Sequence, residues 1–166
     1  MTAGARAVRP YAGALPLRKD AMTQNRNVDG VPEGRGMTPA EFRVVREFLG
    51  LTGGWLAEHV GVSPNTVERW EQGEERIPAA VRGALGDLGR LTGEFVAEVV
   101  NSLVDLPEPG IVTYRDDAEY HAAHPESGYP AAWHRAVVAR VAQEIPGLSI
   151  AYASDVVSED VKVSAE

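Results

Sequence analysis

The chain contains 166 residues, enough for one domain or two small ones, and carries a formal net charge of −8. Hydrophobic residues make up 44% of it, a share typical of folded globular proteins. It has no cysteine, so disulfide scaffolds, thiolate zinc sites and cysteine nucleophiles are excluded. No apolar run approaches the roughly 20 residues that span a bilayer, and no apolar core of a signal peptide stands at the N-terminus, so we expect a cytoplasmic protein with no membrane partner.

The charges are distributed unevenly along the chain. Basic residues outnumber acidic residues six to three over residues 1–36, whereas acidic residues outnumber basic ones eight to six over residues 37–92 and thirteen to four over residues 93–166. Because phosphate repels the acidic C-terminal part, any contact with a nucleic acid is expected upstream of residue 93.

Residues 1–36 are rich in Gly, Pro, Arg and Asn and lack an apolar period, which predicts a disordered extension. A compact sequence opens at Met37, so we expect the extension to include an over-extended translation start. The alternative is that these residues form an arm that enters the minor groove of DNA.

Three short helices are predicted between residues 38 and 73. Thr38-Pro39-Ala40-Glu41 is a capping box with proline at the first helical position, and Gly50 ends this first helix. A second helix is expected over about residues 52–59. The third helix begins after Ser63 as its N-cap and ends before Gly73.

The spacing within this stretch is typical of a helix-turn-helix. Two helices that cross through a short turn need a small side chain at the crossing, which Ala57 supplies. They also need a corner residue that tolerates positive φ, which Gly61 supplies. Val67 and Trp70 are placed on the inward face of the third helix.

The stretch from about residue 38 to residue 90 resembles the Cro/C1-type (XRE-like) helix-turn-helix family. The match extends to Leu51-Thr52 before the second helix and to Trp70-Glu71-Gln72-Gly73 at the end of the third. The resemblance implies that the third helix enters the major groove of double-stranded DNA and that its outward residues contact base edges. These residues are Pro64, Asn65, Thr66 and Arg69.

The resemblance also implies individual contacts. Arg69 can hydrogen-bond to O6 and N7 of guanine, Asn65 can pair with adenine, and Pro64 can touch a thymine methyl group. Gly53 departs from the family, which often has glutamine at this position, and it offers only its backbone amide to a phosphate.

Arg46 and Glu71 stand where the family forms an ion pair between the first and third helices. Such a pair holds the third helix at its angle to the first, so we expect a structural role for both residues. Arg76 is a further candidate for DNA contact, although it would have to reach past the acidic Glu74 and Glu75.

A long helical pattern follows over about residues 79–104, with apolar residues three and four positions apart. Four glycines interrupt it, and each costs about 1 kcal/mol relative to alanine in a helix interior. They are Gly83, Gly86, Gly89 and Gly93. We therefore predict two helices with a break near residues 89–93, inside a DNA-binding domain that covers residues 37–105.

Residues 106–153 are predicted to form a small α+β module after a proline-rich linker. The apolar patterns indicate strands over residues 111–114 and 148–153, with helices over 116–124 and 130–145 between them. A loose acidic tail is expected over residues 154–166.

This module resembles the C-terminal half of phage-associated regulators, including anti-CRISPR-associated repressors. The resemblance lies in Asp117-Ala118-Glu119-Tyr120, His124-Pro125-Glu126 and Trp133-His134-Arg135. It implies that the module serves mainly to form a dimer. Aromatic residues are numerous for so small a module, and we expect them to supply the dimer surface. They are Tyr114, Tyr120, Trp133 and Tyr152.

Histidines in the same module raise the question of a metal site. His121, His124 and His134 lie in sequence near several carboxylates, but nothing supplies a fixed second shell, so we expect surface histidines close to helix caps. No glycine-rich phosphate loop, nucleophile elbow or zincin motif occurs. We therefore expect no catalytic residues, no metal, no cofactor and no enzymatic activity; a metal-dependent hydrolase would have to be purified with bound metal.

The sequence thus predicts a mainly α fold, in which a helix-turn-helix bundle of four to five helices precedes a small α+β module. The predicted function is a sequence-specific DNA-binding transcriptional regulator, a homodimeric repressor that binds an inverted repeat, including one in its own promoter, and associates with the nucleoid when bound. The alternative is an antitoxin that represses its operon and binds a basic toxin through its acidic C-terminal half.

Overall fold

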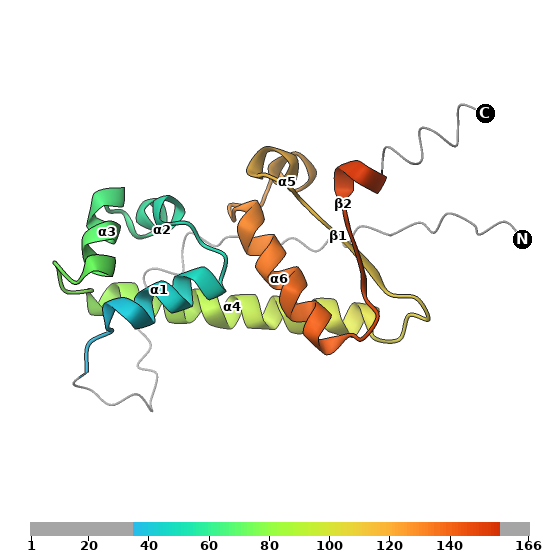
Figure 1. Ribbon diagram of the computed structural model, residues 1–166, viewed down its shortest axis with the longest axis horizontal. Helices are drawn as coiled ribbons and strands as arrows, with labels where there is room; N and C mark the ends of the chain where they lie inside the picture. Colours follow the sequence, from blue (N-terminus) through green and yellow to red (C-terminus); the bar gives the residue numbers. More distant parts are fainter. Residues whose placement is uncertain (1–34, 157–166) are drawn as a thin grey trace, which may run out of the picture.

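The computed structural model describes residues 35–156. In chain order the elements are α1 (Pro39–Phe48), α2 (Gly53–Val60), α3 (Pro64–Gln72), α4 (Ala79–Leu103), β1 (Gly110–Thr113), α5 (Asp117–Ala123), α6 (Ala131–Glu144) and β2 (Ser149–Tyr152). Helices α1 to α3 gather at one end of the long α4, while α5, α6 and the strands lie along its other half (Figure 1). This arrangement confirms the predicted fold class, mainly α with a small α+β part at the C-terminal end.

The first three helices begin and end at the residues that the sequence indicated. Thr38 forms the predicted capping box, since its hydroxyl accepts a hydrogen bond from the Glu41 amide and its own amide donates to the Glu41 carboxylate. Gly61 ends α2 and Gly73 ends α3, with φ values of 74° and 75°. Both conformations are left-handed, which glycine adopts without steric cost.

The helix-turn-helix half is held together by a compact apolar core. Ala57 of α2 is buried at the crossing with α3, as predicted, and Val67 and Trp70 of α3 are buried with it. The indole of Trp70 meets the ring of Phe42 edge-on, with the ring centroids 5.8 Å apart. This packing orients α3 with respect to α1 and α2.

Helix α4 is continuous, so the predicted break near residues 89–93 is wrong. A Cβ atom at Gly83, Gly86 or Gly89 would meet nothing within 4 Å, and these glycines therefore cost only helix propensity. The opposite face of α4 is buried, and each fully buried apolar side chain contributes about 1.5–3 kcal/mol, which outweighs that cost. The buried residues are Val81, Leu85, Leu88, Thr92, Phe95, Val96, Val99 and Leu103.

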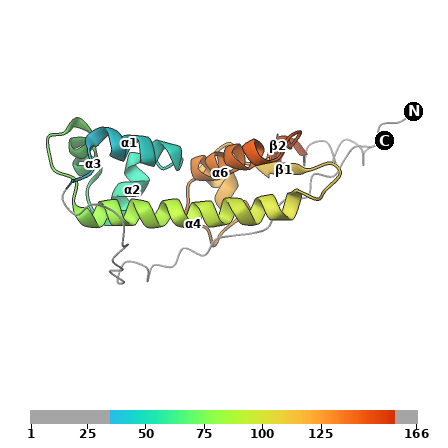
Figure 2. The ribbon, with the colours of Figure 1, turned by 90° about the horizontal axis from the view of Figure 1, so that it is seen from below.

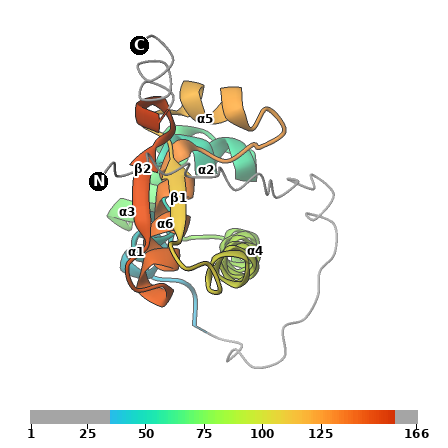
Figure 3. The same cartoon turned by 90° about the vertical axis from the view of Figure 1, so that its right-hand side faces the viewer.

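The C-terminal half is a two-stranded parallel sheet backed by helices. Strand β1 pairs with β2 in a register that sets Gly110 against Ser149 and Thr113 against Tyr152. Helix α6 crosses over from the sheet to lie on α4, as the views along and across α4 show (Figures 2 and 3). The elements match the predicted strands and helices to within a few residues.

The two halves share one hydrophobic core. On the α4 side, Trp133 of α6 stacks on Phe95 with the ring centroids 5.5 Å apart, and its indole nitrogen donates to the buried Thr92 hydroxyl at 3.0 Å. On the other side, the indole nitrogen of Trp55 in α2 donates to the carbonyl of Gly128 at 2.7 Å, and its rings stack on Tyr129. The boundary proposed at residue 105, between the DNA-binding domain and the α+β module, therefore marks a change in secondary structure, while the hydrophobic core continues across it.

The ends of the described region are tied to the folded chain. Arg35 forms an ion pair with Glu41, and its carbonyl accepts a hydrogen bond from Arg82 of α4. The other end lies inside the predicted loose tail, yet residues 153–156 form a helical turn, and Asp155 accepts two hydrogen bonds from the Arg115 guanidinium. The rest of the predicted extension and tail, residues 1–34 and 157–166, lies outside the described residues. None of the helices within residues 35–156 has the length and hydropathy needed to cross a membrane.

Candidate nucleic-acid interface

Helix α3 presents an exposed row of side chains away from the core. Pro64, Asn65 and Arg69 are exposed, whereas Val67 and Trp70 face inward. The N-cap Ser63 fixes the start of this row because its hydroxyl accepts from the Thr66 amide at 3.2 Å. The structure thus brings Pro64 and Asn65 of the first turn and Arg69 of the last turn onto one open face of α3.

Thr66 differs from its neighbours on this face. It is half-buried, and its hydroxyl is hydrogen-bonded to the Ser63 hydroxyl at 2.9 Å. A group that is already paired with its own N-cap has less to offer a base edge than the exposed Asn65. The position of Thr66 therefore favours a role in starting the helix.

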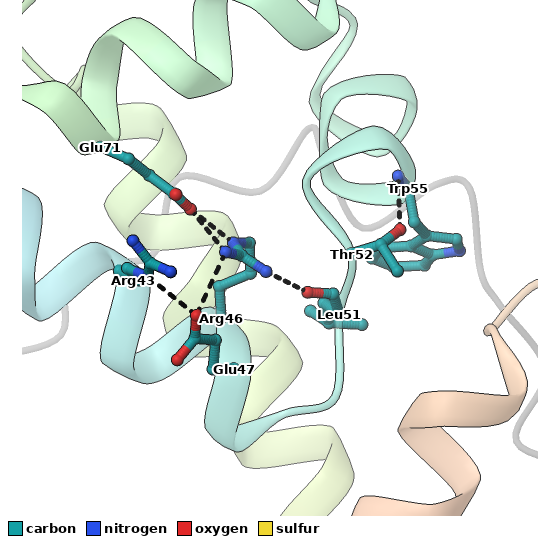
Figure 4. A network of polar contacts seen from close by, with 7 residues as sticks. All are labelled: Arg43, Arg46, Glu47, Leu51, Thr52, Trp55 and Glu71. Atoms are coloured by element: carbon teal, nitrogen blue, oxygen red, sulfur yellow. Dashed lines mark hydrogen bonds and ion pairs between the residues drawn. The ribbon is translucent and has the colours of Figure 1, made fainter.

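A network of charged groups supports α3 from behind (Figure 4). The Arg46 guanidinium on α1 forms an ion pair with Glu71 on α3, in which Nε donates a hydrogen bond of 2.7 Å to Oε1 and Nη2 also lies 2.7 Å from that oxygen, so the predicted ion pair is confirmed. Nη1 of Arg46 donates a hydrogen bond of 2.7 Å to the carbonyl of Leu51, in the loop that leads into α2. The side chains of Arg46 and Glu71 are only 12% and 17% exposed, so this network joins α1, α3 and the loop before α2 in a region of restricted water access.

The loop after α3 folds back over the last turn of the helix. The left-handed Gly73 turns the chain so that the amides of Glu74 and Glu75 both donate to the carbonyl of Arg69, at 2.9 and 3.3 Å. Their carboxylates then lie beside the Arg69 guanidinium, 3.2 Å away for Glu75 and 3.9 Å for Glu74. Sequence reasoning placed these acids in the path of Arg76 and missed their contact with Arg69, because only the backbone path after Gly73 reveals it.

Gly53 and Arg76 are the two residues outside α3 that were predicted to contact DNA. Gly53 opens α2 directly after Thr52, which caps this helix by accepting a hydrogen bond from the Trp55 amide at 3.1 Å. A Cβ atom at Gly53 would lie 3.6 Å from a methyl group of Val67, an ordinary contact. Arg76 is exposed in the loop between α3 and α4. Both residues are accessible enough for phosphate contact, which stays a prediction.

Two of the three histidines of the C-terminal half are buried, contrary to expectation, whereas His121 is exposed as expected. His124 and His134 are each 8% exposed. The Tyr114 hydroxyl is hydrogen-bonded to Nε2 of His124 at 2.8 Å, and the Thr113 hydroxyl to Nδ1 of His134 at 3.0 Å. Burial lowers the pKa of His134 to about 4, with further lowering by the nearby His124 and Arg135. Among the described residues, no cluster of three or more His, Asp or Glu side chains could hold a metal ion.

The aromatic residues expected to form a dimer surface lie mostly inside the molecule. Tyr114, Tyr120 and Trp133 are each no more than 3% exposed, because α5, α6 and α4 cover them. Tyr152 on β2 is half-buried, and the guanidinium of Arg115 lies 4.1 Å from its ring centre. Three of the four residues are therefore core residues of a single chain, and of the four only Tyr152 remains accessible to a partner.

Comparison with known proteins gives two matches. Residues 40–99, which span α1 to most of α4, match the family described as a helix-turn-helix domain. The chain is also 28% identical over 113 residues to the Aca2 repressor of Pectobacterium phage ZF40, a match that covers 68% of this chain and 91% of the relative. The resemblances to XRE-like helix-turn-helix proteins and to phage-associated repressors are thereby confirmed.

Proposed function

We propose that this protein is a repressor that binds an inverted repeat of DNA as a homodimer. It is a DNA-binding regulator of transcription, because it carries a helix-turn-helix domain and is similar over 68% of its length to a phage repressor. The observation that carries this proposal is the exposed row of Pro64, Asn65 and Arg69 on a helix whose angle is fixed from behind. A rigidly held helix with polar and cationic side chains on its open face suits the major groove.

In the proposed complex, the N-terminal part of α3 lies in the major groove. Arg69 hydrogen-bonds to O6 and N7 of a guanine, Asn65 pairs with an adenine, and Pro64 packs against a thymine methyl group. The N-terminus of α2 at Gly53 directs a backbone amide toward a phosphate, where the helix dipole adds to the attraction. Bound over a promoter, the protein excludes RNA polymerase.

The dimer is proposed to form through the C-terminal half, and the exposed strand β2 supports this. Within residues 35–156, β2 pairs only with β1, so its outer edge has no neighbouring strand. Ile150 at its middle is 48% exposed. Such an edge can pair with the same strand of a second copy across a two-fold axis, because an antiparallel pairing of identical strands is self-complementary.

Dimerisation sets the geometry of the target. Two copies of α3 would lie in successive major grooves on one side of the duplex, with half-sites about 10 base pairs apart. Tethering the second α3 raises its effective concentration to about the millimolar range, which increases the affinity for an inverted repeat by about 10²- to 10⁴-fold over a single half-site. This gain explains how a near-neutral DNA-binding half could hold its operator.

Selection of bound sequences from a random duplex library tests the proposal directly. We expect a motif with two-fold symmetry, and Arg69→Ala should cost about 1–3 kcal/mol on that motif and relax the preference at one base pair in each half-site. The matched control is Arg90→Ala, which removes another exposed arginine that is ion-paired to a glutamate, Glu94, but lies on α4. Failure to recover a motif would refute the repressor, and it would equally count against an antitoxin that represses its operon. Recovery of a motif together with co-purification of a small basic protein from the native host would favour the antitoxin.

A further inference from the structure

We propose that Glu68, on the open face of α3, is a further specificity-determining residue, whose carboxylate recognises a cytosine by accepting a hydrogen bond from its 4-amino group. The same carboxylate rejects base pairs that present an acceptor at that place. This inference rests on the proposed function, because it concerns the same recognition helix. It adds a base contact to those proposed for Asn65 and Arg69.

The position of Glu68 follows from the period of the helix. Four exposed residues of α3 recur at the spacing i, i+3, i+4 and i+7, which is that of one face of an α-helix. They are Asn65, Glu68, Arg69 and Gln72. Val67 and Trp70 are buried on the opposite side. Glu68 is one residue closer than Arg69 to the N-terminal end of α3, so a groove that receives both Asn65 and Arg69 also receives Glu68.

The carboxylate of Glu68 has its acceptors unoccupied. Within residues 35–156 it forms no hydrogen bond and no ion pair. None of the residues three or four positions away on α3 is a cation, so an ion pair within the helix cannot form. Glu71, by contrast, is held by Arg46 behind the helix. Glu68 therefore approaches DNA as a negative charge that still needs a donor.

The major groove offers few donors to such a group. An ionised carboxylate can only accept hydrogen bonds, whereas O6 and N7 of guanine, N7 of adenine and O4 of thymine are acceptors as well. The donors are the amino groups of cytosine and adenine. In adenine the amino group stands beside the acceptor N7, which repels a carboxylate, and in cytosine it stands beside a C–H group. Cytosine is therefore the base that suits Glu68.

This contact affects specificity because it depends on the base. Repulsion between the Glu68 carboxylate and the phosphates acts on every duplex, so it cancels when two affinities are compared. The free protein contributes no difference either, because no bond to Glu68 has to be broken first. What remains is whether a donor or an acceptor faces the carboxylate, and one wrong base pair typically weakens binding by about five- to 150-fold.

The experiment measures how the wild type, Glu68→Gln and Glu68→Ala bind duplexes in which each position of the selected motif is varied. For the wild type, we expect one position in each half-site where cytosine is favoured over thymine by at least about fivefold. Both variants should lower this ratio to less than about twofold, and their affinities for all duplexes should rise because a negative charge is lost. Arg69→Ala should leave the ratio in place, because adjacent residues point about 100° apart around the helix.

Glu58→Gln on α2 is the matched control. Glu58 is also exposed and, in the described part of the chain, also lacks a hydrogen bond or an ion pair. Its replacement removes the same charge from a helix that does not enter the groove, so every ratio of affinities should stay unchanged. Because Glu68 makes no contact within the fold, its variants should fold as the wild type does, which circular dichroism checks.

A base analogue tests the donor itself. Replacing the cytosine at that position by an analogue that lacks the 4-amino group should weaken binding by the wild type about fivefold and binding by Glu68→Ala less than twofold. The analogue loses the same base-pairing hydrogen bond in both complexes, so the difference between the two proteins reports the contact with Glu68.

The outcomes separate this inference from the function on which it rests. If the Glu68 variants keep the wild-type preference at every position of a recovered motif, Glu68 contacts no base and the inference is refuted, while the proposed repressor stands. Loss of a preference for any base other than cytosine would refute it too. A wild-type protein from which no motif is recovered would refute the proposed function, and the inference with it.

Discussion

Removing one partner of the Arg46–Glu71 pair should destabilise the whole protein and not only its grip on DNA. The two side chains are 12% and 17% exposed, and Arg46 also donates to the Leu51 carbonyl at 2.7 Å. Breaking a fully buried ion pair costs about 3–5 kcal/mol because a charge is left unpaired. Residual water access reduces that figure here, so we expect Arg46→Ala to lower the free energy of unfolding by roughly 2–3 kcal/mol.

Urea unfolding followed by circular dichroism measures this change. The same helix offers a matched control, because Arg43 forms an ion pair with Glu47 at 2.8 Å in which the two side chains are 61% and 54% exposed. Arg43→Ala should cost less than about 1 kcal/mol, as exposed pairs do.

A double-mutant cycle then isolates the pair itself. Glu71→Gln and Arg46→Ala should show a coupling energy on the order of 1–3 kcal/mol, since the residues contact each other directly. Equal losses for Arg46→Ala and Arg43→Ala, or additive losses in the cycle, would refute the argument that burial gives this pair its importance.

Three further predictions follow from the packing and the charges. Gly50→Ala should destabilise the fold by more than about 2 kcal/mol, because φ is +66° and the new methyl group would meet the backbone of α6 closer than 3.0 Å, whereas Gly83→Ala, which meets nothing within 4 Å, should stabilise it by about 0.5–1 kcal/mol; urea midpoints compare them, and a tolerated Gly50→Ala would contradict the close approach. The free energy of unfolding should fall as the pH drops below about 6.5, because the pKa of His134 is about 4 in the fold and 6.5 is its ordinary value, so folding favours the neutral imidazole. Up to about 2 kcal/mol of this free energy is lost by pH 5, and His134→Asn should flatten this part of the stability–pH profile. Ile150→Lys should convert the proposed dimer into a folded monomer, as measured by light scattering, and an unchanged mass would place the interface away from β2.

The helix-turn-helix could be predicted from sequence because its signals are local. Thr38, Ser63, Gly61 and Gly73 each specify a cap or a turn within a few residues, and the structure uses all four as expected. The ion pair between Arg46 and Glu71 joins residues far apart in sequence, and it was found only through the family resemblance.

The errors arose where burial depends on distant parts of the chain. The glycines of α4 suggested a break because sequence reveals their low propensity but not the apolar face that α6 covers. Tyr114 and Trp133 looked like surface for a partner because nothing local shows that one module can bury them. His134 was expected in solvent, whereas β1 and α6 enclose it and Thr113 supplies its hydrogen bond.

The shared core has a consequence for how the proposed dimer meets DNA. Trp133 joins α6 to the middle of α4, Trp55 joins α2 to the loop before α6, and Gly50 lets the end of α1 approach α6 closely. With contacts on several helices, the recognition helix and the C-terminal half cannot rotate independently without breaking buried packing. A dimer formed through β2 would therefore hold its two α3 helices at one separation and one angle, and its operator would tolerate little change in half-site spacing.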